Sequence, residues 1–218
     1  MFAVNTYEQI EAIERELNER HIVILLFVRP SLPGGKEIID EFDYIHHNSG
    51  RFCSIYAVGY TNDARLAERQ GYRRVDRAHG AAWYFSDAAF VQFKNNLESR
   101  LSWKYSGEIE LIVLQSNPGG RQILNFQNYV AIDVNYGIKK EYIDSFPRLM
   151  ESLIRSSRSE VTATEAMKKA GNPRLSIKNI LLHTIEECKK VPGPVKNILK
   201  DRMFYLASTH RLGGGPRV

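Results

Sequence analysis

Cysteine is scarce in this sequence, and long hydrophobic runs are missing from it. Cys53 and Cys188 are the only cysteines among 218 residues, so the chain cannot fold around the disulfide framework that small secreted domains use. The longest continuous apolar run, Ile22–Val28, is far shorter than the roughly 20 residues that a membrane-spanning helix needs. Residues 1–16 are acidic and amphipathic, unlike a secretory or mitochondrial leader. We therefore expect a cytoplasmic protein with no membrane partner.

Complete catalytic motifs are also missing. No G-x-G-x-x-G sequence follows a predicted strand, and the glycines at 34–35 do not complete the G-x-x-x-x-G-K-[ST] loop of nucleotide-binding proteins. The sequence therefore predicts no cofactor. It leaves open whether the chain is an enzyme.

The composition is that of an ordinary globular protein, but its charge is unevenly distributed. Hydrophobic residues make up 43% of the chain and charged residues 25%, which is typical of a chain that folds around its own core. Residues 160–218 contain 11 Lys and Arg against 5 Asp and Glu, whereas residues 1–159 contain 19 against 20. This asymmetry indicates either a solvated helical face or a surface for nucleic acid or an acidic protein.

Helical and strand patterns alternate through the first part of the chain. Asn5 and Glu8 have the spacing of a helix cap, and apolar residues then recur at helical spacing. We expect helices over 6–20, within 29–48, over 62–71, over 88–103 and from 146 to about 154. We expect strands over 22–28, 52–58, 81–85, 108–115 and 129–134, and the Asn117–Gly120 turn predicts that the last two form an antiparallel hairpin.

The character of the sequence changes near Ser156. Thr162 and Glu165 have capping-box spacing, and apolar stripes follow over 177–185 and 195–203, with no convincing strand. We therefore divide the chain into an α/β domain over 1–158, a small basic all-helical segment over 159–210 and a flexible tail over 211–218.

The order of elements over residues 2–85 resembles the thioredoxin-like superfamily. That fold opens with a short strand, a helix, a buried strand, a loop that leads into a helix, and a second buried strand. Here these elements would be the first residues, 6–20, 22–28, 29–48 and 52–58, and the stretch Thr61–Tyr72 is similar to the family's helix before its third core strand. The resemblance covers under half of the chain. It implies a three-layer sheet, for which a flavodoxin-like or Rossmann-like sheet is the rival.

The redox chemistry of that superfamily has no counterpart here. Its Cys-x-x-Cys pair would fall within Arg29–Lys36, which reads RPSLPGGK. Thiol exchange requires a thiolate, which neither Ser31 nor Gly34 can supply. The proline that the family places opposite this loop is also missing between Val75 and Phe85. The resemblance therefore implies a redox-inactive domain, and no catalytic residue is predicted from it.

Basic residues form the first candidate site. Arginines crowd a short stretch of the chain, and helical spacing would align the first three of them on one side of a helix. Guanidinium groups suit phosphates because their fork contacts two oxygens at once. Lys36 follows the Gly34–Gly35 turn, where an anion could also bind. The candidate anion-binding or nucleic-acid-binding residues are Lys36, Arg65, Arg69, Arg73, Arg74 and Arg77.

Acidic residues form an alternative site. Glu108 and Glu110 are two residues apart in a predicted strand, and Asp133 interrupts the next apolar strand. Carboxylates on neighbouring strands are how many nucleases hold a divalent metal. Solvent-facing acids at strand ends explain the same pattern, so a metal site on these three residues is the alternative hypothesis.

The sequence favours a non-catalytic binding or adaptor protein whose basic segments contact nucleic acid or an acidic protein partner. A protein partner or an oligomer is also expected. The alternatives are a metal-dependent nuclease that uses the three acids, and a subunit of a larger enzyme complex.

Overall fold

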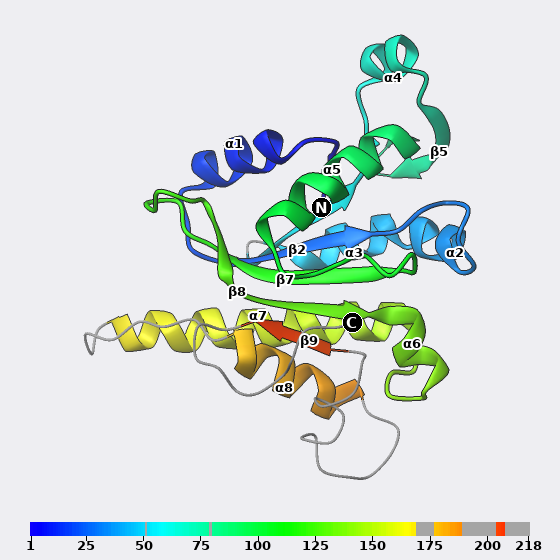
Figure 1. Ribbon diagram of the computed structural model, residues 1–218. Helices are drawn as coiled ribbons and strands as arrows, with labels where there is room; N and C mark the ends of the chain where they lie inside the picture. The colour runs from blue at the N-terminus through cyan, green and yellow to red at the C-terminus, as the bar shows by residue number, and fades with distance from the viewer. Residues whose placement is uncertain (51, 79, 169–176, 189–203, 208–218) are drawn as a thin grey trace.

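A computed structural model describes residues 1–50, 52–78, 80–168, 177–188 and 204–207. The chain is a mixed α/β protein in which helices cover both faces of a mixed sheet (Figure 1). None of the helices in these residues is long and apolar enough to span a bilayer.

The main sheet has six strands. Their order across the sheet is β1 (Phe2–Val4), β3 (Cys53–Val58), β2 (Ile22–Phe27), β7 (Glu110–Ser116), β8 (Leu124–Asp133) and β9 (Phe204–Ala207). Strands β1, β3 and β2 are parallel, whereas β7, β8 and β9 each run antiparallel to the strand before them in this order. The predicted β7–β8 hairpin is confirmed.

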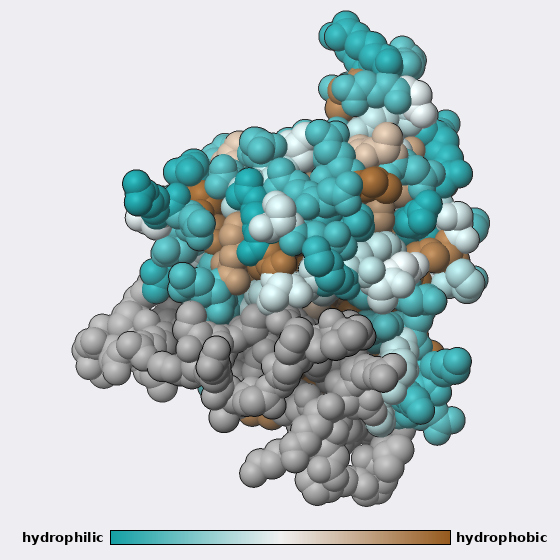
Figure 2. Space-filling view, viewed as in Figure 1, coloured by the Kyte–Doolittle hydropathy of each residue, from teal (hydrophilic) through white to brown (hydrophobic). Residues whose placement is uncertain are grey.

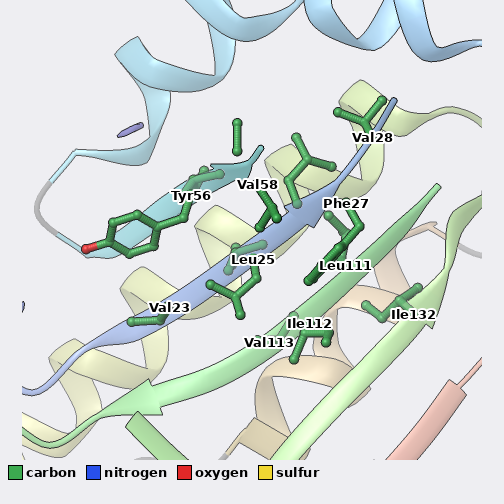
Figure 3. Packing of buried hydrophobic residues seen from close by; sticks show 14 of the residues in the cluster. Val23, Leu25, Phe27, Val28, Tyr56, Val58, Leu111, Ile112, Val113 and Ile132 are labelled. Carbon is green, nitrogen blue, oxygen red and sulfur yellow. The ribbon is translucent and has the colours of Figure 1, made fainter. Parts of the chain in front are cut away.

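Strand β2 lies at the centre of the core. All six of its residues are fully buried, because helices cover both sides of the sheet. Figure 3 shows Val23, Leu25 and Phe27 packed among side chains of β3, β7 and β8. A strand that is covered on both faces has a continuous apolar sequence rather than an alternating one, and this pattern made β2 predictable.

The helices form two layers. Helices α1 (Tyr7–Leu17) and α5 (Asp87–Arg100) lie on one face of the sheet, and α3 (Phe42–Ser49), α7 (Phe146–Lys168) and α8 (Ile177–Cys188) lie on the other (Figure 1). The cap predicted for α1 is wrong by one position. The capping box is formed by Thr6 and Gln9, whereas the side chain of Asn5 donates to the Tyr72 hydroxyl at 3.0 Å.

A smaller sheet projects from the main one. Its strand order is β4 (Tyr60–Thr61), β6 (Ala81–Phe85) and β5 (Arg73–Ala78), and α4 (Ala64–Gln70) lies between β4 and β5 in the chain. Figures 1 and 2 show this region as a largely hydrophilic projection. Tyr60, Trp83 and Phe85 are buried at its base, where Tyr60 and Trp83 pack against Phe42.

Further sequence predictions on helices and strands need correction. The helix expected within 29–48 is two helices, α2 (Gly35–Asp40) and α3, with Glu41 between them. Strand β5 was not predicted, nor was the short helix α6 (Val134–Lys139). No new helix begins at Thr162, because α7 continues through Lys168 and across the expected boundary at 158.

Another correction concerns the C-terminal part of the chain. The segment expected to be all-helical contributes β9, which pairs with β8 at the edge of the main sheet. The apolar stripe at 177–185 is confirmed as α8. The stripe at 195–203 and the tail at 211–218 lie outside the described residues.

Candidate anion-binding site

The segment Arg29–Lys36 leaves the carboxyl end of β2 and turns into α2. The Leu32 amide donates to the Arg29 carbonyl at 3.0 Å, and the Gly35 amide donates to the Leu32 carbonyl at 2.9 Å. A Cβ atom on Gly35 would lie 2.2 Å from the Arg29 carbonyl oxygen, so only glycine fits there. Gly34 has a φ of 76°, which is a left-handed conformation that also favours glycine. The two glycines therefore set the position of Lys36.

An open pocket of about 270 Å³ lies between this segment and β5. We call it the β5 pocket. Three cationic side chains from two distant parts of the chain line it, together with apolar and hydroxyl-bearing neighbours. The lining residues are Pro30, Ser31, Lys36, Ile39, Arg73, Arg74 and Val75.

The cations of the β5 pocket reach solvent. The Lys36 side chain is 73% exposed and forms an ion pair with Asp40 at 2.8 Å, one helical turn away. The Arg73 side chain is 54% exposed, and Arg74 is exposed as well. Ion pairs at such exposed sites contribute little stability, because water screens them. The lining of the pocket therefore carries three solvent-exposed cations.

Asp87 joins the two walls of the pocket. It is the first residue of α5, where Ser86 is the N-cap. Its carboxylate accepts hydrogen bonds from the Arg29 guanidinium at 2.7 and 3.1 Å, and from that of Arg73 at 3.4 Å. The guanidinium of Arg73 also lies 5.6 Å from the centre of the Phe85 ring. These contacts hold Arg73 beside the segment that carries Lys36.

The predicted arginine row is divided by the fold. Arg65 and Arg69 lie on α4, which ends at Gln70 because Gly71 adopts a left-handed conformation with a φ of 66°. Arg73 therefore does not continue a helical row. It is instead the first residue of β5. Of the six predicted residues, the structure brings Lys36, Arg73 and Arg74 together and places Arg65 and Arg69 outside the pocket. Arg77 belongs to β5, and its side chain lies outside the described part of the structure.

The three candidate acids have separate partners. Glu110 is buried, and its carboxylate accepts hydrogen bonds from Trp103 Nε1 at 2.6 Å and from the Ser106 amide at 3.1 Å. Asp133 lies opposite Glu110 on β8, but it caps α6 by accepting from the Tyr136 amide at 2.9 Å. Burial raises the pKa of Glu110, and the charge of Asp133 adds to this effect.

Glu108 lies outside β7, where it is exposed and accepts from Asn135 Nδ2 at 2.6 Å. Within the residues that the structure describes, no group of three or more His, Cys, Asp or Glu side chains could hold a metal ion. The predicted juxtaposition of Glu108 with Glu110 and Asp133 as a metal site is therefore not found. The acids serve instead as hydrogen-bond acceptors at the ends of β7 and β8.

Both thiols are buried away from the β5 pocket. Cys53 is 4% exposed and its thiol lies 3.7 Å from the Ser49 carbonyl, while Cys188 is fully buried beside the Arg148 carbonyl. Burial raises the pKa of Cys53 to about 12. This placement is that of a small buried hydrophobe.

Sequence reasoning missed a buried polar network at the opposite end of β2. The Tyr56 hydroxyl donates to Glu14 Oε1 at 2.5 Å, and His21 Nε2 lies 3.1 Å from Glu14 Oε2 and 2.8 Å from Ser54 Oγ. Glu14 fell on the apolar stripe of α1 rather than on its polar face, which was the signal available in the sequence. All four side chains are buried. The network anchors α1 to the sheet, because Glu14 lies on α1 whereas Ser54 and Tyr56 lie on β3.

A second open cavity, of about 430 Å³, lies along α7 and the end of α8. Two arginines, Arg148 and Arg155, and two glutamates, Glu151 and Glu187, line it together, and Arg155 pairs with Glu187 at 3.6 Å. Mixed charges of this kind do not select a ligand of one sign. The β5 pocket is therefore the stronger candidate site.

Comparison with known proteins adds no relative to this description: no family model, no curated protein and no solved structure matches the chain.

Proposed function

We propose that this protein is a non-catalytic binding module, built on a redox-inactive thioredoxin-like scaffold, that recognises a negatively charged partner at the β5 pocket. The observation that carries the proposal is the convergence of Lys36, Arg73 and Arg74 on one pocket from two segments that are far apart in the chain. Positive charge that is gathered in a concave site concentrates anionic ligands there.

The sheet supports the scaffold. Strand β3 lies between β1 and β2, and all three are parallel, with a helix between each strand and the next along the chain. This order of elements agrees with the opening of the thioredoxin-like fold, and the antiparallel strands β7 and β8 differ from the all-parallel sheet of the rival folds. The β5 pocket then lies where that family has its active-site loop.

The thiols support a scaffold without redox chemistry. The loop Arg29–Lys36 has no cysteine, and burial raises the pKa values of both Cys53 and Cys188, which disfavours their thiolates. We therefore expect that the protein does not accelerate the reduction of insulin disulfides by dithiothreitol. Turnover that disappears in Cys53→Ser would contradict this part of the proposal.

Binding is tested by fluorescence anisotropy with two anionic probes, a labelled oligothymidylate and a labelled glutamate-rich peptide, at low salt. We expect at least one probe to bind, and the triple variant Lys36→Ala/Arg73→Ala/Arg74→Ala to weaken its binding by about tenfold or more, which is about 1.4 kcal/mol. For the oligonucleotide, log K should fall linearly with log salt, and each cation that neutralises a phosphate should steepen this fall by about one. Each of the cations that is removed should therefore make the slope shallower by about one.

The matched control removes one lysine and two arginines elsewhere. Arg65 and Arg69 on α4 and Lys104, whose side chain is 72% exposed, lie outside the pocket. The variant Arg65→Ala/Arg69→Ala/Lys104→Ala changes the net charge by the same amount. Equal weakening in both triple variants, or the absence of binding to either probe, would overturn the proposal.

A further inference from the structure

We infer that the partner is an acidic peptide segment that binds in extended conformation and adds a strand to β5. This inference rests on the proposed function and names the class of its partner.

Strand β5 is the outer strand of the small sheet. The order of that sheet is β4-β6-β5, and β6 is the only strand that pairs with β5 among the residues the structure describes. An outer strand presents a row of backbone N–H and C=O groups that a further strand can pair with. The backbone of β5 is therefore a template for an extended segment.

The pocket lies along this outer side of β5. Successive residues of a strand point to opposite faces of its sheet, yet Arg73 and Arg74, which pair in regular register with Phe85 and Tyr84, both line the same pocket. A space that two such residues share lies beside the strand, not above one face. The opposite wall is formed by Pro30, Ser31, Lys36 and Ile39. A peptide that enters this space meets the β5 backbone on one side and the start of α2 on the other.

The charges of the pocket select the peptide. Lys36, Arg73 and Arg74 are exposed cations, and ion-paired hydrogen bonds to carboxylates are about twice as strong as neutral ones. The ladder between β5 and β6 is also shifted between Arg74 and Asp76. Bulges and charges on an outer strand deter indiscriminate strand pairing, and the cations of β5 make a segment of opposite charge the favoured addition.

The lining favours a peptide over a nucleic acid. None of the described lining residues is aromatic, whereas binding of single-stranded nucleic acid relies on aromatic side chains that stack on bases. Pro30, Ile39 and Val75 supply apolar contacts instead.

The test uses a labelled peptide in which glutamate and valine alternate, together with two N-methylated versions of it. One version carries the methyl groups on the odd-numbered residues, and the other carries them on the even-numbered residues. N-methylation keeps every side chain and charge but removes the N–H donor. In an added strand, only alternate N–H groups point toward the neighbouring strand. We expect one methylated version to lose at least about tenfold in affinity and the other to bind nearly as well as the parent. Amide hydrogen exchange at Arg73–Val75 should slow when the parent peptide is bound.

The outcomes separate the inference from the proposed function. If both methylated versions bind like the parent, or weaken equally, while the pocket triple variant still loses the peptide, strand addition is wrong and the anion-binding function stands. If oligothymidylate binds more tightly than the peptide and depends on the same three cations, the partner is a nucleic acid and the inference is wrong. If neither probe binds, both proposals fail.

Discussion

Strands β2 and β5 have the same length of six residues but occupy opposite environments. Strand β2 is apolar throughout, is fully buried, and has strand neighbours on both sides. Strand β5 has the sequence RRVDRA, lies at the outer side of the small sheet, and borders the β5 pocket. The comparison indicates a division of labour, because a buried strand stabilises the fold while a charged outer strand remains available to a partner.

The first prediction compares the two strands by truncation. Leu25→Ala in β2 should lower the free energy of unfolding by about 2–5 kcal/mol, since it leaves a cavity in a fully packed site. Val75→Ala in β5 should cost less than about 1 kcal/mol, because Val75 is only partly buried. Urea unfolding followed by circular dichroism measures both. Similar losses in the two variants would show that β5 is as much a part of the core as β2.

The same contrast explains what the sequence could predict. The apolar runs of β2 and β3 are signals contained in a few adjacent residues, so both strands were predicted nearly to their ends. The helix over 62–71 was likewise predictable, because the Asp63 cap and the Gly71 terminus that bound α4 both act within one helical turn. Local patterns of this kind do not depend on the rest of the fold.

Strands β5 and β9 could not be predicted from local sequence patterns, because each forms by pairing with another strand of its sheet. The single apolar residue Val75 gives β5 no strand signature, and β9 exists through its pairing with β8, far away in the chain. The β5 pocket depends on the same long-range placement. The sequence singled out Lys36 and Arg73, but only the fold shows that they share a pocket and that Arg69 does not.

The second prediction concerns the segment that links the two regions. Gly35→Ala would place a Cβ atom against the Arg29 carbonyl oxygen, and this steric conflict should lower the free energy of unfolding by about 1–3 kcal/mol. Because the turn positions Lys36, binding at the β5 pocket should weaken too. Gly119→Ala is the control, since nothing lies within 4 Å of its added Cβ, and it should change stability by less than about 0.5 kcal/mol. Equal effects in the two variants would contradict this account of the turn.

The third prediction uses the buried carboxyl group of β7. Burial raises the pKa of Glu110 above its ordinary value of 4.5, so the folded state holds this proton more tightly than the unfolded state does. Stability from this group is present below pH 4.5 and is lost as the pH rises through the folded-state pKa. Glu110→Gln removes this dependence. The stability of the variant relative to the wild type should therefore rise with pH, by at most about 1.4 kcal/mol per pH unit.

Urea unfolding of Glu110→Gln and of the wild type at a series of pH values measures this difference. The contributions of the other titrating groups cancel when the two free energies of unfolding are subtracted, because both proteins contain those groups. A difference that stays constant from pH 4.5 to neutrality would show that Glu110 ionises as readily in the folded as in the unfolded chain.

The fourth prediction concerns the smallest effect, the ion pair between the segment that follows β2 and the start of α5. Arg29 and Asp87 are 35% and 48% exposed, so their coupling in a double-mutant cycle of Arg29→Ala and Asp87→Ala should be about 0.2–1 kcal/mol. Urea is the suitable denaturant because it adds no salt, and the coupling should shrink when salt is added. The effect on binding should be larger than the effect on stability, since Asp87 also holds Arg73 beside the pocket. A coupling above about 2 kcal/mol that salt does not change would show that this pair behaves as a buried interaction, and the contrast between the buried strand β2 and the exposed surroundings of β5 would no longer hold.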